Sequence, residues 1–270
     1  MLPAFAELGR GTPLVHRLGL ATRGNTHLTT DDVLHALDRG VNFLNWCGHR
    51  DGIWSAVRQL PAARRQQVVI AFQFSARTAV EARRELDETL RELRTDYLDL
   101  LTFYYVEHES EWEIIAGRDG ALPVLREAQA RGTVRLIGLT THQRPLAAAR
   151  ARNRDLDVLM VRYNAAHRGA ETEVFPLTDA AGIPVIAFTG LRWGALLEPS
   201  SDDPPPGAPD CYRFVLSHPS VAVALMAPDN RAELEADLRL LDDWRGLSPA
   251  ELAALRAHGD RVHRFAGSFP

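Results

Sequence analysis

Residues 68–105 read VVIAFQFSARTAVEARRELDETLRELRTDYLDLLTFYY, and this stretch decides the fold. It begins with a continuous apolar run at 68–74 and ends with another at 97–105. Between them, over 78–93, apolar residues beginning with Val80 recur near helical spacing. Apolar strands without alternation are typical of a parallel sheet that is covered on both faces. The stretch therefore predicts a strand, a helix and a second, parallel strand.

The same pattern extends along the whole chain. Eight apolar runs of strand length lie at 17–22, 41–47, 68–74, 97–105, 134–140, 157–163, 183–189 and 221–227. Amphipathic helical stretches separate them, and no GxGxxG turn occurs that would favour a doubly wound sheet. Residues 1–270 are therefore predicted to form one α/β domain, a single (β/α)₈ TIM barrel.

A loop at the mouth and a C-terminal helix are also predicted. The longest and most proline-rich connection, 190–214, is expected to be a flexible loop at the C-terminal mouth, where such barrels place their sites. A C-terminal helix is expected over 248–265, because Ser248 can cap it and Pro249 suits its first turn.

Composition and charge exclude several classes of function. The net charge of −4 gives no reason to expect nucleic acid or an anionic membrane as a partner. The N-terminus has no signal-peptide pattern and no apolar run reaches membrane length, so we expect a cytoplasmic protein. Neither the histidines nor Cys47 and Cys211 have metal-site spacing, so no metal is predicted.

All 31 basic residues are arginines. Any mechanism that needs a lysine amine is therefore excluded, whether as a Schiff base, in a phosphate loop, or as the cation that tunes a neighbouring acid.

Several segments, in order, resemble signatures of the aldo-keto reductase superfamily. They are HRLGLAT (16–22), ALDRGVNFLN (36–45), TLRELRTDYLDLL (89–101), ARGTVRLIGLTTH (130–142), RYN (162–164) and IPVIAFTGLRWGALL (183–197). The resemblance covers nearly the whole chain and implies a barrel of the same type, with its site at the mouth.

The resemblance also implies four catalytic residues, and none of them matches. In the family a Tyr protonates the carbonyl oxygen as NADPH delivers hydride, a Lys paired with an Asp lowers the pKa of that Tyr, and a His orients the substrate. Here Asn45 stands at the Asp position, Gln73 at the Lys position and Tyr104 at the His position. The Tyr position is Arg50, or His49 if the loop is one residue out of register. Without lysine, the arrangement cannot be rebuilt elsewhere.

The positions that hold NADP(H) in the family also differ. Thr140, Thr141 and Met160 stand where Ser, Asn and Gln would hold the nicotinamide amide, and a Met side chain cannot donate a hydrogen bond. Asp229 stands near the position of the base that binds the phosphate. The candidate cofactor-binding residues are Thr140, Phe188, Asn230 and Arg231. No cofactor is certain, and NADP(H) stays a candidate that these departures disfavour.

Polar residues expected at the mouth form the candidate site. The candidate catalytic residues are His49, Arg50, Tyr104, Asn45 and Gln73. His49 is the candidate general acid–base and Arg50 a candidate clamp for a carboxylate or phosphate. The alternatives are an exposed loop histidine and an ion pair between Arg50 and Asp51. The candidate substrate-binding residues are Trp46, Tyr105, Thr141, His142, Arg162, His167 and Trp193.

Three functions are consistent with these residues. The first is non-reductive acid–base chemistry, such as elimination, isomerisation or cyclisation, on a small polar or carbonyl-bearing molecule. The second is an NAD(P)H-dependent oxidoreductase in which His49 or Tyr104 is a substitute proton donor. The third is a non-catalytic ligand-binding or regulatory protein. In each case the expected partner is a small molecule, bound by a monomer or a homodimer.

Overall fold

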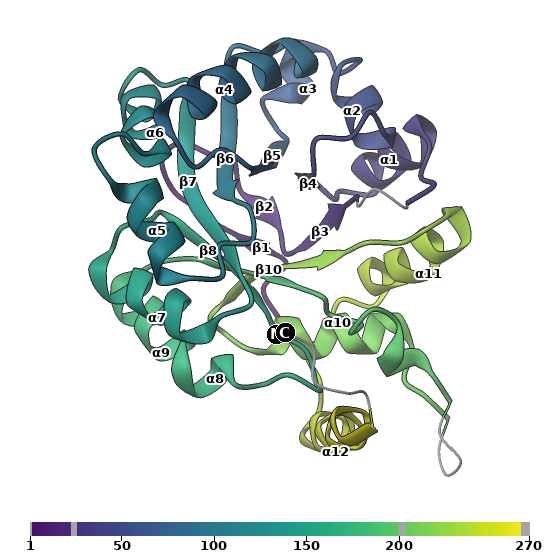
Figure 1. The fold of residues 1–270 in the computed structure, drawn as a ribbon. Helices are drawn as coiled ribbons and strands as arrows, with labels where there is room; N and C mark the ends of the chain where they lie inside the picture. Colours follow the sequence, from purple (N-terminus) through teal and green to yellow (C-terminus); the bar gives the residue numbers. More distant parts are fainter. Residues whose placement is uncertain (1, 23–25, 200–203, 266–270) are drawn as a thin grey trace.

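Eight parallel strands close into a barrel in the computed structural model, which describes residues 2–22, 26–199 and 204–265 (Figure 1). The strands are β3 (Leu18–Ala21), β4 (Phe43–Trp46), β5 (Val69–Phe74), β6 (Leu98–Phe103), β7 (Val134–Thr141), β8 (Val158–Arg162), β9 (Val185–Phe188) and β10 (Val221–Met226). They pair in chain order, and β10 closes the ring against β3. The predicted (β/α)₈ barrel is confirmed.

Helices surround the barrel (Figure 1). They are α1 (Thr30–Asp38), α2 (Gly52–Val57), α3 (Ala62–Arg65), α4 (Ala79–Leu93), α5 (Glu109–Ala116), α6 (Ala121–Ala130), α7 (Arg144–Asn153), α8 (Ala170–Glu173), α9 (Phe175–Ala181), α10 (Ala208–Ser217), α11 (Arg231–Asp242) and α12 (Pro249–Phe265). Two of them start with a reciprocal capping box, formed by Thr29 with Asp32 before α1 and by Thr78 with Glu81 before α4. Val80 is 78% exposed, because it lies in the first turn of α4, off the buried face.

Apolar side chains fill both faces of the strands. One cluster, which includes Phe43, Leu100 and Ile186, lies inside the barrel, and a larger one lies between the strands and the helices. Gly138 on β7 allows close packing inside the barrel, because a Cβ there would meet the carbonyl oxygen of Val158 at 2.8 Å. Burial on both faces explains why the strand sequences are continuously apolar.

A short hairpin that the sequence did not predict precedes the barrel. Its strands β1 (Phe5–Ala6) and β2 (Val15–His16) are antiparallel and have two residues each, too short for a periodic pattern. The buried guanidinium of Arg17 next to it donates to the carbonyl oxygens of Leu216 and Val221. The hairpin is thereby attached to the last strand of the barrel.

The segment 190–214 is not one continuous loop. It contains the 3₁₀ helix η1 (Ala195–Leu197), and its last part belongs to α10, which starts at Ala208. Proline richness favoured a loop in the sequence, but Pro209 lies in the first turn of α10, where its fixed φ and missing N–H are compatible with a helix. Residues 200–203 lie outside the described part of the chain.

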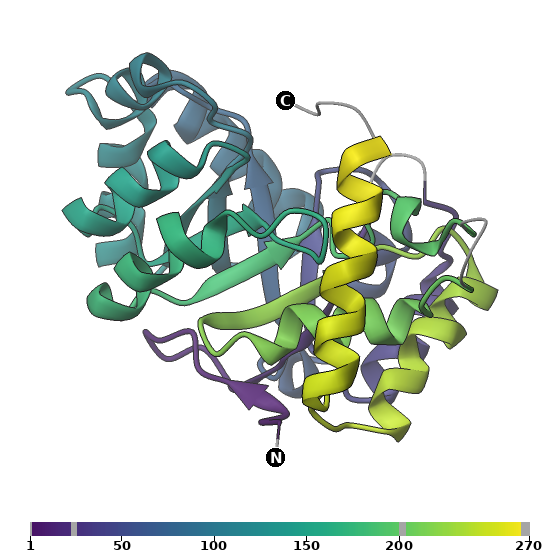
Figure 2. The ribbon, with the colours of Figure 1, turned by 90° about the horizontal axis from the view of Figure 1, so that it is seen from below.

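The final helix α12 ends at the expected residue and packs on the outside of the barrel beside α10 (Figure 2). The imidazole of His258 is 3.0 Å from the carbonyl oxygen of Leu196 in η1. Gly259 brings the helix against the backbone of Ala165, where any Cβ would overlap the carbonyl group. Within the described ranges, no helix combines the length and apolar character that a membrane span requires.

Candidate functional site

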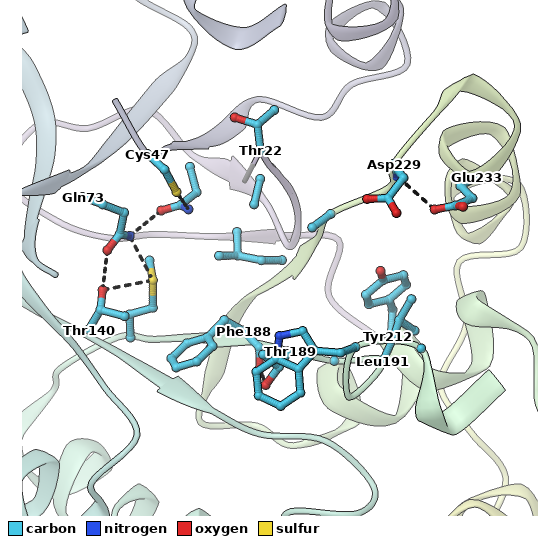
Figure 3. Close-up of a pocket in the computed structure, with 18 of the residues that line it drawn as sticks. Thr22, Cys47, Gln73, Thr140, Phe188, Thr189, Leu191, Tyr212, Asp229 and Glu233 are labelled. Atoms are coloured by element: carbon cyan, nitrogen blue, oxygen red, sulfur yellow. Dashed lines mark hydrogen bonds between the residues drawn. The ribbon is translucent and has the colours of Figure 1, made fainter. Parts of the chain in front are cut away.

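A cavity of about 350 Å³ lies at the C-terminal mouth of the barrel, a volume typical of small-molecule sites (Figure 3). Strand ends supply its inner part, and the loops after β6, β9 and β10 supply its walls together with α10 and α11. The inner part consists of Ala21, Thr22, Asn45, Cys47, Gln73, Thr140, Met160, Phe188 and Leu225. The walls consist of Tyr104, Tyr105, Thr189, Gly190, Leu191, Trp193, Gly194, Leu197, Tyr212, Ala227, Asp229 and Glu233.

Uncharged groups that bond to one another form the floor of the cavity (Figure 3). The Gln73 amide nitrogen donates to Oδ1 of Asn45 at 2.6 Å and lies 3.3 Å from the sulfur of Met160. The Thr140 hydroxyl donates to Oε1 of Gln73 at 2.8 Å. Asn45 and Gln73 therefore make one buried, neutral pair.

The amide of Asn45 in the floor can still bind a ligand. Both N–H groups of the Gln73 amide face acceptors within the floor, and so does the hydroxyl proton of Thr140. Among the described residues, the partner of the Asn45 amide nitrogen is the sulfur of Cys47, at 3.8 Å. Because an amide nitrogen carries two N–H groups, Asn45 keeps a donor for a ligand oxygen.

Two stacked phenols form one wall. The rings of Tyr104 and Tyr105 lie 4.2 Å apart, and each residue is 37% exposed. Burial is the main cause that raises the pKa of both phenols above its ordinary value. Both tyrosines therefore keep their protons at neutral pH and act as hydroxyl donors.

Two predicted catalytic residues point away from the cavity. Gly48, with a φ of +84°, turns the chain after β4, and both His49 and Arg50 are exposed. Arg50 forms an ion pair with Glu92 at 2.7 Å, outside the barrel. The alternative partner Asp51 instead accepts from the backbone of α2 as its N-cap. The structure thus brings Asn45, Gln73 and Tyr104 together and leaves His49 and Arg50 outside.

The predicted substrate-binding residues divide in the same way. Tyr105 and Trp193 line the cavity. The residues behind or beside the lining are Trp46, Thr141, His142, Arg162 and His167. Trp46 is buried and donates to the carbonyl oxygen of His49 at 2.6 Å. His167 stays neutral, because burial, and then the charge of Arg162, lowers its pKa to about 4.

The nicotinamide end of an NADP(H) site is not reproduced by the described residues. Thr140 and Phe188 line the cavity, and Phe188 provides a flat apolar face. The hydroxyl of Thr141, however, faces its own backbone and accepts from the N–H of Gln143 at 3.0 Å. Met160 presents a sulfur atom that accepts and cannot donate.

The phosphate end does not fit either. Asp229 and Glu233 line the outer end of the cavity (Figure 3). Arg231 bonds instead to Asp32 at 3.1 Å and to Glu235 at 2.8 Å. Asn230 is the N-cap of α11. Two acids near a phosphate are repulsive.

Sequence reasoning missed two parts of the site. Tyr212 and Glu233 line the cavity from α10 and α11, and neither residue was named as a site candidate. Glu107 pairs with His142 across the loops after β6 and β7, at 3.0 Å. The one signal for Glu107 in the sequence was its place in TFYYVEHE, close to the two tyrosines. Among the residues that the structure describes, no cluster suited to a metal ion occurs.

The chain was compared with known families and solved structures. The model of the aldo/keto reductase family matches residues 17–210. The chain is similar to aldo-keto reductase AKR11C1 from Bacillus halodurans, with a TM-score of 0.70 to its apo form and 0.72 to its holo form. Each alignment has 18% identity and covers 96% of this chain and 95% of the other, which shows a shared fold. Since the family model spans well over half of the sequence, this chain belongs to the aldo/keto reductase family.

Proposed function

We propose that this barrel binds a small carbonyl-bearing molecule in its mouth cavity and transfers protons on it without delivering hydride. Elimination, isomerisation and cyclisation all belong to this class, because each can begin with removal of a proton beside a carbonyl group. The site lies on the rigid ends of barrel strands, where this fold supports many chemistries.

The neutral bond between Gln73 and Asn45 carries this proposal. In the reductases a charged pair at these positions tunes the proton donor, whereas here the two amides are satisfied by each other at 2.6 Å. Since no lysine exists in the chain, no other residue can restore that relay. The misfit between the described lining and NADP(H) is a second argument against hydride transfer.

The cavity suits a molecule with a polar end and a flat apolar body. The second N–H of Asn45, which no described residue accepts, and the hydroxyl of Tyr104 are donors that can bind a carbonyl oxygen and stabilise negative charge on it. Phe188 and Trp193 offer aromatic surface to the remainder.

Solvent deuterium exchange tests the proposal. The protein is incubated in D₂O with a panel of small aldehydes and ketones that bear C–H bonds beside the carbonyl, with no nicotinamide present. Proton NMR should show enzyme-dependent loss of those C–H signals for at least one compound. N45L should slow this exchange at least tenfold by removing the donor, while H49Q, at an exposed loop residue, should not change it.

The two other functions predict different results. Tight binding of NADPH, followed by quenching of tryptophan fluorescence, would favour a reductase with Tyr104 as donor. Trp193, which lines the cavity, makes the measurement sensitive to the site. Compounds that raise the melting temperature without any exchange would instead favour a ligand-binding protein.

A further inference from the structure

A carboxylate and an imidazole form a pair directly behind the aromatic wall of the cavity. Glu107 follows β6 and His142 follows β7, so both lie at the C-terminal mouth. Oxygen Oε1 of Glu107 is 3.0 Å from both the backbone nitrogen and the ring Nδ1 of His142. The two bonds fix the position and the rotation of the imidazole.

The other ring nitrogen of His142 has no partner within the part of the chain that the structure describes. A carboxylate at Nδ1 selects the form in which Nδ1 carries the proton and Nε2 presents its lone pair. Nε2 is buried, and no described residue makes a hydrogen bond to it. A buried polar atom without a partner is costly, and in native proteins it calls for a specific explanation.

The position of the imidazole supplies that explanation. Its ring lies 4.7 Å from the ring of Tyr105 and 5.1 Å from that of Phe188, and both of these residues line the cavity. His142 is therefore separated from the cavity by one layer of side chains. Tyr105 has a φ of +44°, which is strained for a bulky residue and is often found at functional sites. A ligand can reach Nε2 only if this layer opens, and Tyr105, 37% exposed against 7% for Phe188, is the more exposed of the two residues.

Two other groups near the cavity are poor proton acceptors at neutral pH. Burial, and then the charge of Asp51, raises the pKa of the Cys47 thiol to about 11. Burial, and then the charge of Arg162, lowers the pKa of His167 to about 4, so its imidazole is a poor acceptor at neutral pH. His142 differs in its contacts, because the carboxylate of Glu107 bonds to its ring.

We propose that His142 is the proton-transferring residue of this barrel and that Glu107 is its positioning residue. This inference rests on the proposed function. Nε2 takes a proton from the carbon beside the carbonyl: the C–H bond breaks, an N–H bond forms, and the electron pair moves onto the carbonyl oxygen. The imidazolium then returns the proton to carbon or to a leaving group, so no oxidant or reductant is consumed.

The test compares H142Q with H49Q in the deuterium-exchange assay. H142Q should lower the exchange rate at least 100-fold, within the usual range for loss of a general base, while H49Q keeps the wild-type rate. Circular dichroism and melting temperature establish that both variants are folded. Exchange that persists in H142Q would overturn this inference and leave the proposed function intact. A wild-type protein that exchanges no compound of the panel would overturn both.

A spectroscopic measurement isolates the positioning residue. Nitrogen-15 NMR of histidine-labelled protein should show Nδ1–H and an unprotonated Nε2 for His142. E107L removes the oxygen that accepts both bonds, so it should abolish this preference and slow exchange about tenfold, whereas E109Q, two residues away, should leave the His142 signals unchanged. An unaltered His142 spectrum in E107L would contradict the role of Glu107.

Discussion

The phenol of Tyr212 lies 3.4 Å from Oδ2 of Asp237, and both side chains are almost fully buried where α10 meets α11. Tyr212 also lines the cavity, so this contact connects the site to the helical layer. Burial is the main cause that raises the pKa of Asp237 from 3.8 to about 7. The carboxyl group is thus held in a place that disfavours its charge.

Asp237 should make the protein less stable as the pH rises. Its folded-state pKa lies above its unfolded-state value, so the folded protein binds more protons between about pH 4 and pH 7, and stability falls over that range. D237N keeps the acceptor for Tyr212 and removes the charge. The free energy of unfolding of D237N, relative to that of the wild-type protein, should increase by roughly 2–3 kcal/mol between pH 5 and pH 8. Urea denaturation at both pH values measures this, with exposed D87N as control. An equal difference in stability between D237N and the wild-type protein at both pH values would contradict this prediction.

A charge placed alone on the cavity floor should be costly. N45D puts a carboxylate beside the Gln73 amide in a buried position, and we expect a loss of about 2–4 kcal/mol at pH 8. The double variant N45D/Q73K rebuilds an ion pair and should recover most of that loss. Urea denaturation of both variants tests this. A double variant no more stable than N45D would contradict the expected recovery by the ion pair.

The buried imidazole of His16 should make the fold sensitive to acid. Burial, and then the charge of Arg17, lowers the pKa of His16 to about 4. Over this range His16 binds a proton in the unfolded chain and not in the folded one, so stability is lost as the pH falls from about 6.5 to 4. This amounts to about 3 kcal/mol. H16N should flatten the profile of melting temperature against pH over this range. His167 has a similar shift, so part of the slope should persist.

Gly259 should be irreplaceable even though it lies within a helix. Alanine favours a helix by about 1 kcal/mol over glycine, yet a Cβ at this position would overlap the carbonyl group of Ala165. We therefore expect G259A to lower stability by about 1–3 kcal/mol. Gly246 has open space around its Cβ position, so G246A is the matched control in thermal unfolding. Equal melting temperatures for the two variants would show that α12 tolerates displacement.

The strands were readable from the sequence because of where they lie. Each barrel strand is covered on both faces, so its sequence is an uninterrupted apolar run, as in VVIAFQF. Strand ends meet at one mouth in this fold, and for that reason Asn45, Gln73 and Tyr104 could be assigned to a common site. The two-residue strands of the first hairpin carry no such pattern.

The loops were not readable to the same degree. His49 and Arg50 follow a strand directly, but the left-handed turn at Gly48 carries them outward, and counting positions cannot show that. Glu107 and His142 are 35 positions apart, and their contact depends on the paths of two separate loops. Directions of loop side chains are set by tertiary packing, which one sequence leaves unspecified.

The neutral floor also bears on how such a barrel can evolve within its family. If the ancestral pair was Asp and Lys, changing either residue alone would leave the other charge unpaired in the interior. This would lower the stability of the fold by about 3–5 kcal/mol. That is a large share of the net stability of a typical domain. The two substitutions are therefore strongly epistatic, and a lineage that has passed this barrier regains the old relay only by crossing it again.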